Sequence, residues 1–342
     1  MNNDVQRRLT KNDRLQIPAT HLPSFRTSLA AQNKVQNNIL IHLWGGLGDQ
    51  ICAEPTLRWA VEGGMSNCEV TIATNFPELF THLKFKDVYN LNHERPIFDD
   101  YLTFETITQP NETSLTWQFM SHMLTNCVDF PSLCAFRFTL PNSKKEIVLK
   151  PERPSNPELL DLERDKKHHV LIHAGRHWES KTFPVDWWDE TIEEVKKAGF
   201  VPVLIGKDGG PTQGYVATTN AGCVDLRDKT TTMESVWLTQ NLPVIICSDS
   251  APMHMAASGN AFIGYLATVK EPDYIMHWRK GQWAWRMQNF ALGGMWELFG
   301  NLPNSQEDIL VDKVDVEILK KWLPNPQVFG PWAREKMNEY FK

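Results

Sequence analysis

The stretch VIICSDSAPMHMAASG, residues 244–259, combines an apolar run, a polar turn and a short helical pattern. Residues 244–247 are apolar and mostly β-branched, which is typical of a buried strand. Pro252 suits the first turn of a helix, because the N–H group that it lacks would have no partner there, and Gly259 suits the position just after a helix. The stretch therefore predicts a strand, a tight turn and a helix that starts where the strand ends.

The start of this predicted helix has the chemistry of an anion site. Its first N–H groups have no partner within the helix, and the positive end of the helix dipole lies at the same place. Ser250 adds a hydroxyl and His254 adds a ring N–H, so we expect a nucleotide phosphate to bind here. The alternative is that Asp249 or Ser250 only caps the helix and that His254 is a satisfied core histidine.

Composition favours a protein of two domains, because 342 residues exceed the size of one typical core. The net charge of −6 gives no general attraction to nucleic acid or anionic lipid. The six cysteines show no C-x-x-C spacing and no cluster of metal ligands, so we expect reduced thiols and no metal site. Without an apolar run of about 20 residues or a signal-peptide core, we expect a cytoplasmic protein with no transmembrane segment.

Strand patterns alternate with helical patterns between residues 38 and 267. This alternation predicts the α/β class, with parallel sheets and right-handed crossover connections. The five parts expected along the chain are a polar arm at 1–37, an N-terminal Rossmann-like domain at 38–150, a proline-rich linker at 151–167, a C-terminal Rossmann-like domain at 168–325, and a final helix at 326–342 that packs back on the N-terminal domain. The arm has six basic and two acidic residues, so it is either a solvated tail or a contact to an anionic partner.

A second turn of unusual composition follows the strand predicted at residues 38–43. Gly45, Gly46 and Gly48 allow the backbone to turn tightly or to approach a ligand, and Asp49 stands at the start of the following helix. The glycine spacing fits neither the phosphate-loop motif nor the dinucleotide-binding fingerprint. Asp49 is therefore either a helix cap or a carboxylate that faces a ligand.

Parallel α/β sheets bind ligands beyond the carboxyl ends of their strands. Four loops of this chain follow predicted strands in this way, namely the Asp49 loop, the Lys181 loop, the Gly206 loop and the Asp249 turn. Because they share this location, we expect these loops to form one active site between the two domains.

Residues 276–286 interleave aromatic side chains with three cations and contain no acidic residue. Such a stretch can stack on the bases of a nucleic acid and neutralise its phosphates. More commonly, arginines of this kind pack on tryptophans at a domain surface. The possible acceptor contacts in this stretch are Trp278, Arg279, Trp283 and Trp285.

Together these motifs resemble the heptosyltransferase-like glycosyltransferases, the family that includes the lipopolysaccharide ADP-heptose transferases. The most specific likeness is at residues 249–257, which resemble the family signature Asp-[Ser/Thr]-Gly-x-x-His-x-x-Ala. Residues 43–57 resemble the first strand, glycine loop and helix start of the family, and residues 173–184 and 225–230 resemble strands and loops of its second domain. One departure is Ala251, which replaces the signature glycine and would be strained if this position required a positive φ.

The resemblance implies the GT-B architecture, in which two Rossmann-like domains face each other across a cleft. It also implies an inverting transfer of a sugar from a nucleotide-diphosphate sugar to an acceptor hydroxyl, with Asp49 as the general base. The residues expected to bind the donor diphosphate are Lys181, Ser250, Ala251, His254 and Arg176. The residues expected to support the site are Gly46, Gly48, Asp249 and Thr230. The chain has no Asp-x-Asp motif and offers these cations instead, so we expect neither a metal ion nor a cofactor, the nucleotide sugar being a co-substrate.

The sequence is compatible with three functions. The first is transfer to a surface glycan such as lipopolysaccharide. The second is transfer to a hydroxylated (hydroxymethyl) base of DNA, which the aromatic stretch and the basic arm favour and the net charge does not. The third is a non-catalytic protein that binds a nucleotide sugar, against which the joint presence of Asp49, Lys181 and His254 argues. The sequence identifies neither the sugar and nucleotide, nor the acceptor, nor the oligomeric state.

Overall fold

The computed structural model describes residues 38–65, 67–97, 100–106, 125–174, 183–207, 222–267, 272–290 and 323–342. The chain divides into two compact units. Unit 1 comprises residues 1–150 together with 273–285, and unit 2 comprises residues 151–272 together with 286–342. Residues 273–285 therefore belong to unit 1, whereas we expected all of 168–325 to form the C-terminal domain.

Unit 1 is built on a sheet of four parallel strands in the order β3-β2-β1-β4. Its strands are β1 (Asn38–His42), β2 (Glu69–Thr74), β3 (Val88–Asn90) and β4 (Leu102–Glu105). β1 lies inside the sheet and its residues Ile39, Leu40 and Ile41 are completely buried. Burial on both faces explains why this strand is an uninterrupted apolar run.

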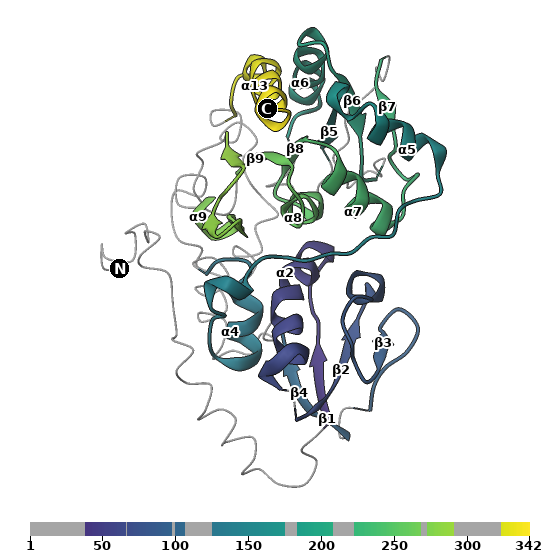
Figure 1. Cartoon of the computed structure of the whole chain (residues 1–342), viewed down its shortest axis with the longest axis vertical. Helices are drawn as coiled ribbons and strands as arrows, with labels where there is room; N and C mark the ends of the chain where they lie inside the picture. Colours follow the sequence, from purple (N-terminus) through teal and green to yellow (C-terminus); the bar gives the residue numbers. More distant parts are fainter. Residues whose placement is uncertain are drawn as a thin grey trace, which may run out of the picture. The chain divides into compact units, whose positions relative to one another are not determined.

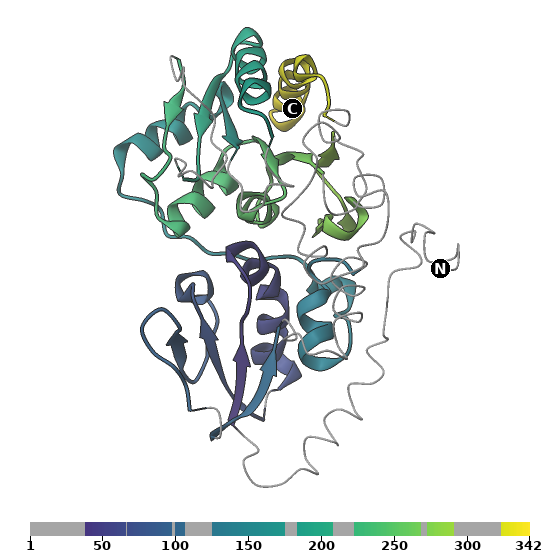
Figure 2. The same cartoon turned by 180° about the vertical axis from the view of Figure 1, so that it is seen from behind.

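Helices cover one face of the unit 1 sheet. Figures 1 and 2 show α2 (Leu47–Trp59) lying against this sheet, beside α4 (Phe130–Phe136). α2 continues into a π-helical turn at Ala60–Gly64, and 3-10 turns lie at Pro77–Phe80 and Asn142–Lys144. Tilted and edge-on ring contacts of Trp59 with Phe136 and Phe138 fill the space between α2 and α4.

The late segment of the chain that joins unit 1 is held there by backbone contacts. It contains the end of α9 (Pro272–Ile275) and an antiparallel hairpin of β10 (Trp278–Arg279) and β11 (Gln282–Trp283). The N–H of Cys127 donates to the carbonyl of Tyr274 at 2.8 Å, and the side-chain amide of Asn126 donates to the carbonyl of Met276 at 2.6 Å. These long-range pairs are invisible to local sequence patterns, which is why the expected boundary at 168–325 included this segment.

Unit 2 is built on six parallel strands in the order β12-β9-β8-β5-β6-β7. Its strands are β5 (His169–His173), β6 (Val201–Leu204), β7 (Val224–Asp225), β8 (Val244–Ser248), β9 (Phe262–Leu266) and β12 (Met287–Asn289). Its helices are α5 (Pro157–Arg164), α6 (Val185–Lys197), α7 (Thr232–Asn241), α8 (Ala251–Ala257) and α13 (Phe329–Tyr340). The parallel sheets of both units confirm the predicted α/β class.

The strand, turn and helix predicted for residues 244–259 are confirmed. β8 lies inside the sheet with all five residues buried, and two residues separate the end of this strand from the start of α8. Pro252 occupies the first turn of α8, as its missing N–H group predicts.

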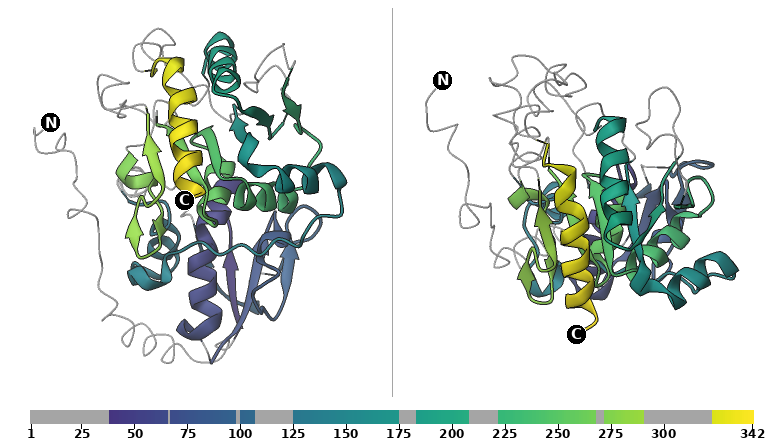
Figure 3. Two further views of the ribbon diagram at one scale, coloured as in Figure 1. Left: turned by 45° about the horizontal axis from the view of Figure 1, so that its top comes forward. Right: turned by 90° about the horizontal axis from the view of Figure 1, so that it is seen from above.

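The C-terminal helix packs on unit 2, not on the N-terminal domain as we expected. Figure 3 shows α13 alongside α6, and the two helices share the core of unit 2. Phe329 meets Trp187 edge to face at 5.5 Å between ring centroids, and the indole N–H of Trp332 donates to Gln288 at 2.7 Å. The apolar side of α13 therefore completes the layer that α6 begins, which no local pattern in 326–342 could reveal.

The segment expected to be a linker contains the helix α5. Its N-cap, Asn156, accepts a hydrogen bond from the N–H of Glu158, and Pro157 occupies the first helical position. The polar arm 1–37 lies outside the described residues, as does most of the expected loop around Lys181. Within the described part of the chain, none of the helices is both long and apolar enough to span a bilayer.

Candidate functional site

The glycine loop of unit 1 connects the end of β1 to the start of α2. Gly45 has a φ of +87°, and Gly46 is the N-cap residue of α2. Asp49 is exposed in the first turn of α2, and its Oδ2 accepts a hydrogen bond from the N–H of Gly46 at 2.8 Å. The capping alternative is therefore observed. It does not exclude chemistry, because an exposed carboxylate with a second oxygen remains open to a substrate hydroxyl.

Gly45 cannot be replaced without moving the Asp49 carboxylate. A Cβ atom at position 45 would lie 2.6 Å from Oδ2 of Asp49, which is closer than real Cβ atoms approach other atoms. The positive φ of Gly45 adds a second requirement for glycine. The two predicted supporting glycines lie next to it, Gly46 at the N-cap and Gly48 inside the first turn of α2.

The side chain of Gln50 holds the glycine loop in place through two hydrogen bonds. Its side chain is completely buried, its amide donates to the carbonyl of Gly45 at 3.3 Å, and its carbonyl accepts from the hydroxyl of Thr74 at 2.6 Å. The loop after β1 is thus tied to the end of β2. Sequence reasoning missed Gln50, although a glutamine directly after the candidate base was available as a signal.

One turn further along α2, Glu54 anchors the helix within unit 1. Its carboxylate is completely buried and accepts from Nε of Arg58 and from the N–H of Val148, both at 2.8 Å. Nε2 of His82 lies 3.3 Å from the same carboxylate. A buried charge with this many donors holds α2 in place, and with it the exposed Asp49.

In unit 2 the turn between β8 and α8 carries Ser250 as the N-cap residue of α8. Its Oγ lies 3.0 Å from Nδ1 of His173 and 3.1 Å from the carbonyl oxygen of Ser248. His173 ends β5 and Ser248 ends β8, so this hydroxyl connects the carboxyl ends of two neighbouring parallel strands. The location agrees with the rule that α/β sheets bind ligands at this edge.

Burial keeps the His173 ring uncharged. Loss of hydration lowers the pKa of His173 to about 4, well below its usual 6.5, so the imidazole is neutral at physiological pH. Gly206, with a φ of +105°, lets the loop after β6 cover this ring, since a Cβ there would lie 2.7 Å from Nε2 of His173. Three strand ends thus converge on His173. Sequence reasoning did not include this residue in the site, although its position at the end of a strand was a signal.

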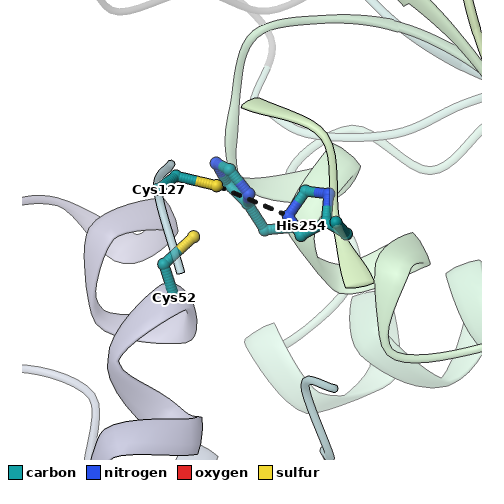
Figure 4. Close-up of side chains that lie close together, drawn as sticks. Cys52, Cys127 and His254 are labelled. Atoms are coloured by element: carbon teal, nitrogen blue, oxygen red, sulfur yellow. Dashed lines mark hydrogen bonds between the residues drawn. The ribbon is translucent and has the colours of Figure 1, made fainter. Parts of the chain in front are cut away.

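Ala251 is not strained. It is the first residue of α8 and is absent from the residues of positive φ in the described part of the chain. The backbone at this position is helical, so the glycine of the family signature is not required for its torsion angles. The neighbouring predicted residues Asp249 and His254 are both buried, and Figure 4 shows His254 on α8.

The remaining predicted donor residues are only partly described. Thr230 is half-buried and its hydroxyl lies 2.9 Å from the hydroxyl of Ser235, beside the N-cap of α7. Lys181 and Arg176 lie in residues 175–182, outside the described part of the chain. Their assignment stays a prediction.

In and around the hairpin of unit 1, residues of the aromatic stretch 276–286 pack on one another, as the interpretation of arginines packed on tryptophans predicted. Trp278 and Trp283 meet edge to face at 5.2 Å between centroids. Arg279 is buried, lies 5.7 Å from the ring of Trp285, and donates to the carbonyl of Trp285 at 3.3 Å. A buried arginine cannot neutralise a nucleic-acid phosphate at the surface, whereas Lys280 of the same stretch is exposed, so the DNA alternative stays a prediction.

Unit 1 also contains a group with metal-ligand chemistry, contrary to the expectation from cysteine spacing. Ligand atoms of Cys52, Cys127 and His277 all lie within 4.8 Å of one another. None of the six cysteines, all of which are described, forms a disulfide. Because Cys127 and His277 are 150 residues apart, no short spacing pattern could have revealed this group.

Comparison with known proteins relates this geometry to a family. Residues 115–263 match the family described as glycosyltransferase family 9 (heptosyltransferase). The match includes β5, β8 and α8 with His173, Ser250 and His254, and it starts after Asp49. The resemblance to the heptosyltransferase-like glycosyltransferases is confirmed. No match was found among curated proteins.

Solved structures of glycosyltransferases are similar over most of the chain. A glycosyl transferase family 9 protein from Veillonella parvula is 9% identical, with a TM-score of 0.52 over 89% of this chain and 97% of its own. The iron-containing dodecameric glycosyltransferase TibC from enterotoxigenic E. coli is 13% identical, with a TM-score of 0.53 over 90% and 77%. The E. coli ADP-heptose lps heptosyltransferase II is 13% identical, with a TM-score of 0.51 over 83% and 99%. At these identities the likeness shows the fold, which is the predicted GT-B class of paired α/β units.

Proposed function

We propose, from the match of residues 115–263 to the heptosyltransferase family, that this protein is an inverting glycosyltransferase that uses a nucleotide-diphosphate sugar. This match carries the proposal because it covers the strand, turn and helix at which Ser250 and His173 meet. The names of two similar structures make ADP-heptose the first donor to test and lipopolysaccharide the first acceptor.

Unit 2 supplies the donor side of the proposed reaction. When Nδ1–H of the neutral His173 donates to the Ser250 hydroxyl, that hydroxyl can turn its single proton from the carbonyl oxygen of Ser248 to a diphosphate oxygen. Lys181 and Arg176 are proposed to supply positive charge, and His254 a ring N–H. Donors that are fixed before the reaction stabilise the charge that develops on the leaving diphosphate. With these cations, we propose that transfer needs no added Mg²⁺ or Mn²⁺.

Unit 1 supplies the proposed general base. The acceptor hydroxyl oxygen forms a bond to the anomeric carbon while the bond from that carbon to the diphosphate oxygen breaks. The electron pair leaves with the diphosphate, and the acceptor proton passes to the carboxylate of Asp49. Attack from the face opposite the leaving group inverts the anomeric centre. Asp49 suits this role because it is exposed in the first turn of α2, after the loop that follows β1, and because Glu54 anchors this helix.

Asp49→Asn removes the proposed general base but keeps the capping hydrogen bond, whereas Asp49→Ala would remove both. Asparagine keeps a side-chain oxygen that can accept from the N–H of Gly46, but it cannot take a proton at neutral pH. We expect Asp49→Asn to lower turnover by about 10²-fold or more, with an unchanged melting temperature. Glu62→Gln, which changes another exposed carboxylate of unit 1, is the matched control.

The assay measures release of nucleoside diphosphate from a panel of nucleotide sugars, together with the donor-induced thermal shift. Asp49→Asn should lose turnover and keep the donor-induced shift, whereas Ser250→Ala should weaken the shift. Near-normal turnover of Asp49→Asn would leave this residue with its capping role alone. A thermal shift without turnover by the wild type, across all donors and acceptors, would instead identify a non-catalytic binder.

A further inference from the structure

We propose that Cys52, Cys127 and His277 form a site in unit 1 for a transition-metal ion, for which Zn²⁺ is the best chemical fit. One ligand atom from each residue lies within 4.8 Å of the other two, and Sγ of Cys127 lies 4.0 Å from Nε2 of His277. Figure 4 shows the thiols of Cys52, on α2, and Cys127 side by side. The inference concerns unit 1 alone and does not depend on the proposed glycosyl transfer.

The separation between Cys127 Sγ and His277 Nε2 is close to that between two ligands of a tetrahedral zinc site, and the other two separations are at most 4.8 Å. Zinc binds sulfur at about 2.3 Å and nitrogen at about 2.0–2.1 Å, so neighbouring ligands of a tetrahedron lie about 3.5–3.8 Å apart. The 4.0 Å separation between Cys127 Sγ and His277 Nε2 would need to close by only a few tenths of an ångström. The fourth position is left to water or to another donor.

The charges of the three ligands suit a buried ion. Cys52 and His277 are 2% and 1% exposed. On binding, each thiol would release its proton to solvent and bind as a thiolate, and the imidazole would bind through Nε2 with its proton on Nδ1. Two thiolates cancel the double charge of Zn²⁺, so the filled site is neutral and burying it carries little desolvation cost.

Three separately fixed segments bring the ligands together. Cys52 lies on α2, while Cys127 precedes α4 and is tied through its N–H to the carbonyl of Tyr274 at 2.8 Å. His277 is held through its carbonyl oxygen, which accepts from the N–H of Ala284 at 3.0 Å. An ion would therefore fasten the late segment 273–285 to α2, in the unit to which that segment belongs.

The competing explanation is a weak thiol hydrogen bond. Sγ of Cys127 lies 3.6 Å from the carbonyl oxygen of Ile275 and 4.0 Å from Oδ1 of Asn126, and a protonated thiol can donate weakly to either. Both of these hydrogen bonds are made by the Cys127 thiol, and neither involves the Cys52 thiol. A Cys52 variant therefore separates the two.

The test measures metal in the full-length protein, grown with zinc and purified without chelator. We expect about one metal ion per chain by elemental analysis, and a thiolate-to-cobalt charge-transfer band when Co²⁺ is added to the metal-free protein. Cys52→Ser, Cys127→Ser and His277→Gln should each weaken Co²⁺ binding by about 100-fold or more. Cys134→Ser, which changes a buried cysteine of α4 outside the group, should bind Co²⁺ like the wild type.

Two results would overturn the proposal. One is a folded wild type that holds no metal and gives no charge-transfer band with Co²⁺. The other is Cys52→Ser binding Co²⁺ as tightly as Cys134→Ser. If the ligand variants do not fold, the wild type still decides: Zn²⁺ should raise the melting temperature of the metal-free protein, and an unchanged melting temperature counts against the site.

Discussion

The hydroxyl of Ser250 lies 3.0 Å from Nδ1 of His173, and this contact joins the carboxyl ends of two neighbouring parallel strands. Through this contact, Ser250 of the signature 249–257 lies within hydrogen-bonding distance of the His173 ring, which burial keeps neutral. It also explains Gly206, since any side chain at that position would displace the ring. The pair is therefore the structural centre of the candidate donor site in unit 2.

The buried His173 should make stability depend on pH over a defined range. Its pKa is about 4 in the folded protein and about 6.5 when unfolded, so between these values the unfolded chain binds a proton that the folded chain does not. The free energy of unfolding should fall as pH is lowered from about 6.5 to about 4, by roughly 3 kcal/mol in total from this group. Above about pH 6.5 both states are neutral and this group adds no pH dependence.

Urea denaturation of the wild type and His173→Gln, at neutral and acidic pH, measures this contribution. The variant should lose part of the acid destabilisation that the wild type shows. His93→Gln, which changes an exposed histidine of unit 1, should retain it. Equal pH slopes for the wild type and His173→Gln would show that His173 is not the buried neutral group described here.

Gly45→Ala should damage both stability and turnover through a single steric contact. The new Cβ would lie 2.6 Å from Oδ2 of Asp49, at a residue whose φ of +87° disfavours any side chain. The backbone conformation alone costs about 1–2 kcal/mol. Displacement of the proposed base by about 1 Å would lower turnover by about 10²-fold.

Gly63→Ala is the matched control, because a Cβ at that position meets no atom within 4 Å. Denaturation and the diphosphate-release assay should leave it close to the wild type. A Gly45→Ala variant as active as Gly63→Ala would mean that the loop holds Asp49 less tightly than its contacts indicate.

Sequence alone predicted the parts of the fold that depend on local patterns. β8 and α8 could be predicted because the β-branched run 244–247 and Pro252 specify a strand and a helix start without distant partners. The role of His173 could not, because its partner is 77 residues away and the pairing of β5 with β8 follows from sheet order. For the same reason, local patterns could not predict that Cys52, Cys127 and His277 lie close together, that residues 273–285 belong to unit 1, or that α13 packs on α6.

Glu54→Gln should be strongly destabilising, although Glu54 lies outside the proposed chemistry. The carboxylate is completely buried and accepts hydrogen bonds from Arg58 and from the N–H of Val148. Neutralising the carboxylate leaves Arg58 without its buried counter-charge. We expect a loss of about 3 kcal/mol in the free energy of unfolding. Denaturant midpoints at constant slope give this value.

Glu69→Gln provides the comparison for that measurement. Glu69 pairs with Lys86 at 2.6 Å on the surface, where water screens the interaction, so no measurable change is expected. Equal effects of the two substitutions would contradict the anchoring role of Glu54.

Ala251→Gly tests whether the departure from the family signature matters. Ala251 begins α8 without a positive φ, so restoring glycine relieves no strain and only adds freedom to the unfolded chain. We expect the variant to be less stable by up to about 1 kcal/mol, and its donor KM to stay within about twofold of the wild type. A gain in stability would instead show that the alanine is strained. A large drop in donor KM would mean that its methyl group keeps the diphosphate away from the backbone.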